Sequence, residues 1–377
     1  MSARRVSRSA WIALSAGAAV LASSWMVERW GARDGARFGR AGAPVDVAFS
    51  ASGDRVFVAA AEDRAIWVLD SASGRRVSRQ GLDQAPTGLV PASGPPLLPQ
   101  VLFTQTTETC ELHPFRERTL ASCHRPGDAD VESARDTVPL VLGAVRDVDG
   151  SVVFALGRLQ GAEPVVELRR YTVEPVHRQP WSLQKSRWLP VPRDFAYAER
   201  WPMVVDEATR HVLLALPGTS QLWVFDTELG FLRSVGVGPD PRGLAVLGDA
   251  GQALVADAEL GQVWKVALDS GELLAKVDAG GGARAIAFDP RRGIAWVAAS
   301  HADAILGLDP GSLRTLVRLP TREGTHALAL DASGGRLIAS NTRDGTVTCF
   351  GLGDVGAAER GATDRRTGFR TLWQATP

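Results

Sequence analysis

The hydrophobic pattern of this chain consists of short apolar runs that are separated by turns rich in Asp, Gly and Ser. The stretch 261–280, "GQVWKVALDSGELLAKVDAG", contains two such runs joined by a turn at 269–271. Several runs, such as "RVFVAAA" at 55–61, are apolar at consecutive positions instead of alternating with polar residues. This predicts β-strands that are buried on both faces. Similar pairs of runs occur at 65–77, 222–235 and 304–317.

The pairs of runs repeat along the chain with a period near 42 residues. A small or apolar residue in the middle of the first run marks each unit, and the markers are Ala48, Leu89, Ala144, Val204, Ala245, Ala287 and Ala329. Four short strands per unit at this period are typical of a β-propeller blade. The sequence therefore predicts an all-β, seven-bladed β-propeller over residues 36–352. The second and third units are longer, which predicts insertions around 125–137 and 178–193.

The two ends of the repeat predict how the ring closes. The last unit supplies only three runs, between Thr325 and Leu352. The short segment 36–40 precedes the first unit and is expected to form the outer strand of the last blade, which would pair two otherwise open sheet edges. The tail from 353 to 377 is polar and rich in Arg, and we expect it to be loosely ordered.

The N-terminal residues 1–30 have the pattern of a signal peptide or a membrane anchor. Arg4, Arg5 and Arg8 precede an uncharged run, 9–27, that is just long enough to span a bilayer. The same features fit a cleavable signal peptide, and both alternatives stay open. Arg residues also follow the run, so charge does not fix its orientation. We expect an exported protein in the periplasm or at the cell surface, or one anchored in the inner membrane.

Charge and cysteine content narrow the classes of function. Lys plus Arg and Asp plus Glu both number 42, so the net charge is zero and nucleic-acid binding is not indicated. Cys110 and Cys123 are equidistant from a turn at 115–118 and would face each other across a hairpin. This spacing allows a disulfide, which would require an oxidising compartment. Cys349 is expected to be a buried free thiol.

The units resemble the YVTN family of bacterial β-propeller repeats. The resemblance covers about 36–352, and it is carried by the third run of a unit, which ends in Asp before a short turn: Val68-Leu69-Asp70, Val224-Phe225-Asp226 and Leu308-Asp309. The YVTN tetrapeptide itself is degraded, for example to "AWVAAS" at 295–300. The resemblance implies an exported binding or surface module. It also implies alternatives, because related propellers include lactonases, lyases and redox-enzyme subunits.

The residues that recur in several units have a structural explanation. The repeated Asp residues precede hairpin turns, where an Asp side chain accepts hydrogen bonds from backbone N–H groups. They are Asp70, Asp226, Asp269 and Asp309. The glycines at 280–282 lack the Lys-Ser/Thr sequence of a phosphate-binding loop and are expected to form a turn between blades.

The candidate binding residues lie in loops that would meet on one face of the propeller, around its central channel. Arg242, Arg284 and His326 occupy matching positions of the last three units. The turns between second and third strands add Asp257, His301, Asp303, Asn341 and Asp344. Trp181 and Trp188 lie among basic residues in the predicted 178–193 insertion and are candidates for a partner surface.

These residues favour a non-catalytic scaffold that binds a protein or a small anionic ligand, with no cofactor and with membrane contact only through 9–27. No nucleophile–base pair, metal motif or cofactor fingerprint is present in the sequence. The alternative is a lactonase- or lyase-type enzyme in which Asn341 and Asp257 hold a divalent cation and His326 acts as the base. A second alternative is a propeller subunit of a periplasmic redox enzyme.

Overall fold

The computed structural model describes a protein built from β-strands. The chain divides into two units, 1–40 and 41–377, and every described residue belongs to the second. The described residues are 43–91, 101–105, 109–115, 118–124, 139–146, 152–159, 165–173, 181–190, 201–331, 333–353 and 369–375. In these residues the strands form seven four-stranded antiparallel sheets. Among them no helix is long and apolar enough to cross a membrane. The predicted signal or anchor, 1–30, lies outside the described part.

The first three sheets follow one another along the chain. The first contains β1 (Pro44–Phe49), β2 (Arg55–Ala60), β3 (Ala65–Asp70) and β4 (Arg76–Gly81). The second contains β5 (Pro86–Pro91), β6 (Val101–Gln105), β7 (Thr109–Phe115) and β8 (Arg118–His124). The third contains β9 (Pro139–Arg146), β10 (Val152–Leu159), β11 (Val165–Val173) and β12 (Trp181–Leu189).

The remaining four sheets have the same order of strands. The fourth contains β13 (Met203–Asp206), β14 (His211–Leu216), β15 (Gln221–Asp226) and β16 (Phe231–Gly236). The fifth contains β17 (Pro241–Val246), β18 (Gln252–Asp257), β19 (Gln262–Ala267) and β20 (Leu273–Asp278), with the 3-10 turn η2 (Gly248–Ala250) after β17. The sixth contains β21 (Ala283–Asp289), β22 (Ile294–Ala299), β23 (Ala304–Leu308) and β24 (Thr315–Pro320). The seventh contains β25 (Thr325–Leu330), β26 (Arg336–Asn341), β27 (Thr346–Leu352) and β28 (Phe369–Ala375).

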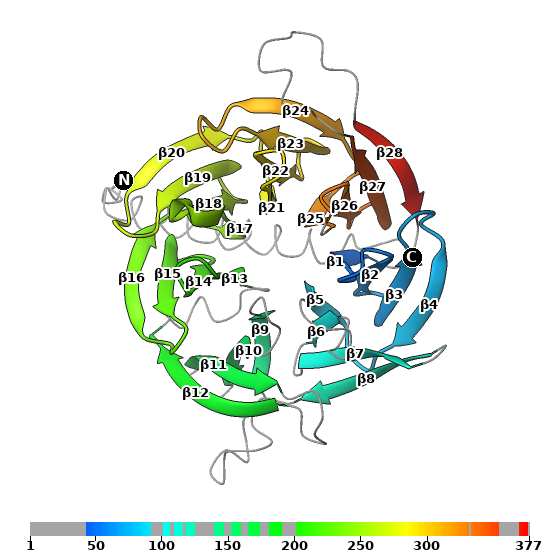
Figure 1. The fold of residues 1–377 in the computed structure, drawn as a ribbon, viewed down its shortest axis with the longest axis horizontal. Coiled ribbons are helices and arrows are strands. Elements are labelled where there is room, and N and C mark those ends of the chain that lie inside the picture. The colour runs from blue at the N-terminus through cyan, green and yellow to red at the C-terminus, as the bar shows by residue number, and fades with distance from the viewer. Residues whose placement is uncertain are drawn as a thin grey trace, which may run out of the picture. The chain divides into compact units, whose positions relative to one another are not determined.

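Within the unit 41–377, the first strands of the sheets contact one another in a closed series. β1 contacts β5, and the series continues through β9, β13, β17, β21 and β25 back to β1. Figure 1 shows these first strands inside and the fourth strands outside. This arrangement is compatible with a β-propeller. Each of the seven sequence markers, Ala48 to Ala329, lies in the first strand of a different sheet, so the seven predicted units correspond to the seven sheets.

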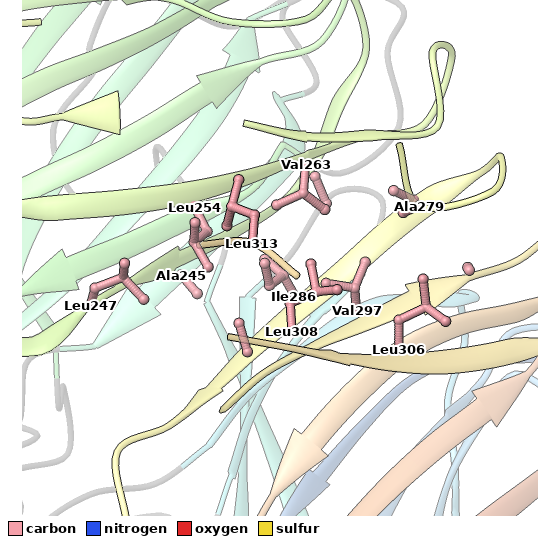
Figure 2. Packing of buried hydrophobic residues seen from close by; sticks show 14 residues of the cluster. Ala245, Leu247, Leu254, Val263, Ala279, Ile286, Val297, Leu306, Leu308 and Leu313 are labelled. Atoms are coloured by element: carbon pink, nitrogen blue, oxygen red, sulfur yellow. The ribbon is translucent and has the colours of Figure 1, made fainter. Parts of the chain in front are cut away.

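Burial along the strands follows from this packing. β22 is buried at all six positions, and β2, β14, β18 and β26 at five of six, as the unbroken apolar runs predicted. The outer strands β4 and β20 instead alternate between exposed and partly buried positions, because only one of their faces meets a neighbouring sheet. Figure 2 shows the core between the fifth and sixth sheets, where Leu254 and Val263 pack with Ile286 and Val297.

The repeated Asp residues have the predicted role at the hairpin turns. The Asp70 carboxylate accepts the N–H of Ser73 at 2.9 Å, Asp226 accepts the N–H of Gly230 at 2.7 Å, and Asp309 accepts the N–H of Ser312 at 2.7 Å. Hydrogen bonds from Ser73 and Ser312 lower the pKa of Asp70 and Asp309. The glycines at 280–282 connect β20 to β21, and all three have positive φ, as an inter-sheet turn requires.

The prediction for ring closure is wrong. The fourth strand of the seventh sheet is β28, which comes from the C-terminal tail and not from 36–40. Trp373 of β28 is buried, and its indole Nε1 donates to the Ser71 carbonyl of the first sheet at 2.9 Å. The tail therefore supplies an apolar anchor, so residues 369–375 are not loosely ordered. Residues 36–40 lie outside the described part.

The predicted insertion at 178–193 is also wrong in its placement. Residues 181–189 form β12, the fourth strand of the third sheet. β11 and β12 have nine residues each, whereas most strands of the other sheets have six, so part of the extra length of this unit lengthens its strands. The other predicted insertion, 125–137, lies outside the described residues.

The structure bears on the predicted facing of Cys110 and Cys123 and on the predicted free thiol of Cys349. Cys110 and Cys123 are directly opposite each other in the β7–β8 pair, as the sequence spacing predicted. The disulfide between them stays a prediction. Cys349 of β27 is a free, buried thiol, as expected, and burial raises its pKa to about 12.

Candidate functional site

Five of the first strands share a β-bulge near their start. The strand residues on either side pair with consecutive residues of the second strand, so one residue is left out of the pairing. Bulges change the direction of a side chain, and they are common next to functional sites. The residues left out are Val45 in β1, Thr87 in β5, Arg242 in β17, Arg284 in β21 and His326 in β25.

Three of these bulged residues are polar and lie on consecutive first strands. We call Arg242, Arg284 and His326 the bulge cluster. The Arg284 Nη1 atom lies 3.4 Å from His326 Nε2, and His326 Nδ1 lies 2.9 Å from the Val45 carbonyl oxygen. A carbonyl oxygen can only accept, so Nδ1 carries the ring hydrogen. In the neutral ring, Nε2 is then the acceptor of a hydrogen bond from Arg284.

The environment of His326 keeps its imidazole neutral. The ring is partly buried, and its pKa is lowered to about 4, first by burial and then by the positive charge of Arg284. Arg242 acts in the same direction, and the carboxylate of Asp46 opposes both. A ring with this pKa is a weak base at neutral pH. The predicted role of His326 as a general base is therefore not supported.

Arg242 is paired with the carboxylate of Asp240, and Asp257 holds the backbone of Asp240. The Arg242 Nε atom donates to Asp240 Oδ1 at 2.7 Å. The backbone N–H of Asp240 donates in turn to Asp257 Oδ2 at 2.7 Å, and Leu260 N–H donates to Asp257 Oδ1 at 2.6 Å. Asp257 is fully buried, and desolvation raises its pKa. Asp257 thus anchors the loop that positions Arg242, and both of its oxygens are already used.

Asp46 also belongs to this region, although the sequence analysis missed it. It follows the bulged residue of β1, and it is buried. Its Oδ1 accepts Val47 N–H at 2.9 Å, and its Oδ2 accepts Leu89 N–H of β5 at 2.8 Å. A signal was present in the sequence, because the matching position in the other bulged strands is Gly or Ala: Gly88, Gly243, Ala285 and Ala327.

Asn341 does not join the bulge cluster. It is fully buried inside the seventh sheet. Its Nδ2 donates to the hydroxyls of Thr346 and Thr348 at 3.1 and 3.0 Å, and its Oδ1 accepts from the Thr325 hydroxyl at 3.2 Å. Both donors and the carbonyl oxygen of the amide make hydrogen bonds within the sheet. The hypothesis that Asn341 and Asp257 are cation ligands therefore has no support from their geometry.

The other predicted residues lie on turns between second and third strands and not on the bulged first strands. His301 and Asp303 are exposed on the turn between β22 and β23, where Asp303 has a φ of 46°. Asp344 accepts the Thr346 hydroxyl at 3.0 Å within its own turn. Within the described residues, no group of three or more His, Cys, Asp or Glu side chains could hold a metal ion.

Trp188 is exposed on the outer strand of the third sheet. Its side chain is 56% exposed, and Trp188 pairs with Glu167 of β11. Neighbouring Arg187 turns to the fourth sheet, where it donates to the Leu229 carbonyl at 3.1 Å. The side chain of Trp181 is outside the described part. Trp188 therefore stays a candidate partner residue, now on the outer strand β12 and not on an insertion.

Comparisons with known proteins support the fold alone. No protein-family model matches the chain, and no curated protein matches it. A solved structure of the hydrazine synthase of Kuenenia stuttgartiensis is similar, with a TM-score of 0.62 and 13% sequence identity. The match covers 82% of this chain and 95% of that chain. At this identity, the two chains share an all-β architecture of repeated sheets.

Proposed function

We propose that this chain is a seven-bladed β-propeller that serves as a non-catalytic binding module and takes an anionic group at the bulge cluster. The observation that supports this proposal is that the same bulge position is occupied by a basic or imidazole side chain on three neighbouring first strands. These residues are Arg242, Arg284 and His326. Guanidinium groups are the usual partners of carboxylate and phosphate groups.

The charge balance favours an anion over a cation. Arg242 is paired with Asp240, but the hydrogen bond made by Arg284 among the described residues goes to a neutral imidazole. Asp46 is the other carboxylate near His326, and two backbone N–H groups hold it. The positive charge of Arg284 is therefore available to a ligand, and a cation at the same place would be repelled.

The proposed location is outside the cytoplasm. The run 9–27 has the length and composition of an export signal or anchor. The facing positions of Cys110 and Cys123 would suit a disulfide formed in an oxidising compartment. A periplasmic redox subunit would share this location, and the similar hydrazine synthase chain is part of an enzyme. A similar fold does not imply a similar activity, so we favour the binding role over the role of a redox-enzyme subunit.

The test is the thermal unfolding of the full chain in millimolar sodium sulfate, against sodium chloride of equal ionic strength. A ligand that binds only the folded state raises the unfolding midpoint by mass action. We expect sulfate to raise the midpoint of the unmodified chain and to have no specific effect on Arg284→Gln.

The matched control is Arg318→Gln, on the outer strand of the same sheet, where the exposed guanidinium donates to the Ala302 carbonyl at 2.8 Å. This variant should respond like the unmodified chain, which separates binding from general salt stabilisation. An equal sulfate response in Arg284→Gln would overturn the proposal.

A further inference from the structure

We infer that the bulge cluster takes up one proton together with its anion, so that the ligand is an oxyanion held between Arg284 and a protonated His326. This inference rests on the proposed function and adds the chemistry of the ligand and a dependence on pH. It concerns the atoms that face each other across β21 and β25.

The hydrogen bonds of His326 determine where an added proton would go. Nδ1 already carries a hydrogen, which it donates to the Val45 carbonyl at 2.9 Å. The added proton must therefore bind Nε2, which lies 3.4 Å from Arg284 Nη1. An Arg guanidinium has donors only. In the empty site, protonation would place two cationic donors against each other with no acceptor between them.

An oxyanion removes this conflict. Its oxygens accept hydrogen bonds, so one anion can bridge the Nε2–H of His326 and the guanidinium of Arg284. A carboxylate and a tetrahedral sulfate or phosphate share this chemistry. A neutral hydroxyl or amide ligand could accept a hydrogen bond, but it would not offset the second positive charge.

The charged groups around His326 determine how its protonation responds to an anion. Arg284 of β21 and Arg242 of β17 oppose protonation, and Asp46 of β1 favours it. Two backbone N–H groups hold the Asp46 carboxylate, and Asp240 holds Arg242. The residues around His326 keep the ring neutral, with a pKa of about 4. A bound anion adds a negative charge beside the ring and raises this pKa, and linkage requires protonation to strengthen anion binding equally.

The sign of the pH dependence follows directly. Above the pKa of His326 in the complex, no proton is taken up and the affinity does not change with pH. Between that value and about 4, the complex holds a proton that the free protein lacks. The affinity should then rise about tenfold for each pH unit lost.

The experiment is calorimetric titration of the full chain with sulfate at several pH values, in buffers that differ in their enthalpy of ionisation. Sulfate carries no proton at these pH values, so any proton taken up belongs to the protein. We expect an uptake that approaches one proton per sulfate at pH 5 to 6. Titration with acetate at pH 6, where this carboxylate is almost fully ionised, should give the same uptake if a planar carboxylate fits. Only sulfate will bind if the site needs a tetrahedral anion.

Two substitutions assign the proton to His326. His326→Asn keeps a donor for the Val45 carbonyl, and His326→Gln places an amide near the Nε2 position. Neither amide side chain can take up a proton in this pH range. Either variant, if folded by circular dichroism, should bind sulfate without proton uptake. Sulfate binding with no uptake in the unmodified chain, or unchanged uptake in these variants, would overturn the inference and leave the binding proposal intact. No sulfate binding at any pH would overturn both.

Discussion

β-Bulges occur at opposite edges of these sheets, and the two sets carry different side chains. On the first strands, three of the five residues bulged near the start of their strand are Arg or His, and a further bulge lies in the middle of β9. Six of the outer strands also have a bulge, and five of the residues left out of pairing are apolar: Val77, Leu232, Leu274, Leu316 and Leu372, with Gln184 as the sixth. Both sets of strands have the same backbone irregularity, but the displaced residues include Arg and His on the first strands and are mostly apolar on the outer strands.

The difference reflects what lies beside each edge. A first strand faces other first strands, so a residue displaced there can meet its counterparts, as Arg284 meets His326. An outer strand has a free edge that could pair with another chain, and a bulge makes such pairing harder. Most of the displaced side chains are exposed, for example Val77 at 50% and Leu274 at 41%, whereas Leu316 is partly buried against the core. The bulges on the first strands therefore bring polar side chains of neighbouring sheets together. The bulges on the outer strands make the exposed sheet edge irregular.

The largest effect is expected on the outer edge, from Trp373→Ala. Trp373 is buried between the seventh and first sheets and hydrogen-bonds to Ser71, so its loss should lower the free energy of unfolding by about 3 kcal/mol. Leu372→Ala, at the adjacent bulge, should cost less than about 1 kcal/mol, because Leu372 is 37% exposed. Urea denaturation of both variants measures the difference. Equal losses would show that the bulged residue is part of the ring closure.

The next effect concerns the inner bulge at His326. The unfolded ring has an ordinary pKa of 6.5, and the folded ring has a pKa of about 4. The unfolded chain therefore binds more protons as pH falls from about 6.5 to about 4, and stability should drop over this window, by at most about 3 kcal/mol. His326→Asn should lack this contribution. Denaturation of both proteins at pH 7 and pH 4.5 gives the difference, and parallel losses would contradict the assigned environment.

The smallest effect on stability is expected from the deletion of Leu274, which would remove one outer bulge. The straightened β20 should change the free energy of unfolding by about 1 kcal/mol and should self-associate more than the unmodified chain, because its edge becomes regular. Leu274→Ser keeps the bulge and removes the exposed apolar group. Analytical ultracentrifugation should show greater association for the deletion only. If Leu274→Ser self-associated as much as the deletion variant, the bulge would not be what prevents pairing at this edge.

The sequence predicted the sheets well because their physical signals are local. A period of 42 residues and unbroken apolar runs such as that around Val297 follow from strands buried on both faces. Turn residues were equally predictable, because Asp70 and Asp309 act on neighbouring backbone groups. β28 was missed because it follows a long polar segment, and because its apolar residues Phe369, Leu372 and Trp373 do not alternate as in a regular strand. The bulge at Leu372 is the reason for the broken alternation.

The candidate site was predictable only in part. Equal spacing of 42 residues identified Arg242, Arg284 and His326 as equivalent. The bulge that displaces all three residues is a shift of register, which residue types alone do not reveal. Asn341 and Asp257 were misassigned because a polar residue at the end of a strand has the same pattern whether it faces solvent or the interior. Both are fully buried.

The central claim is that the three bulged side chains form one anion site. Its most direct test is the NMR signal of the His326 ring during titration of the full chain with sulfate at pH 6. We predict a saturable shift of this signal in the unmodified chain and in Arg318→Gln, and no shift in Arg284→Gln. A His326 signal that stays constant while sulfate shifts other resonances would contradict the account, because the anion would then bind elsewhere.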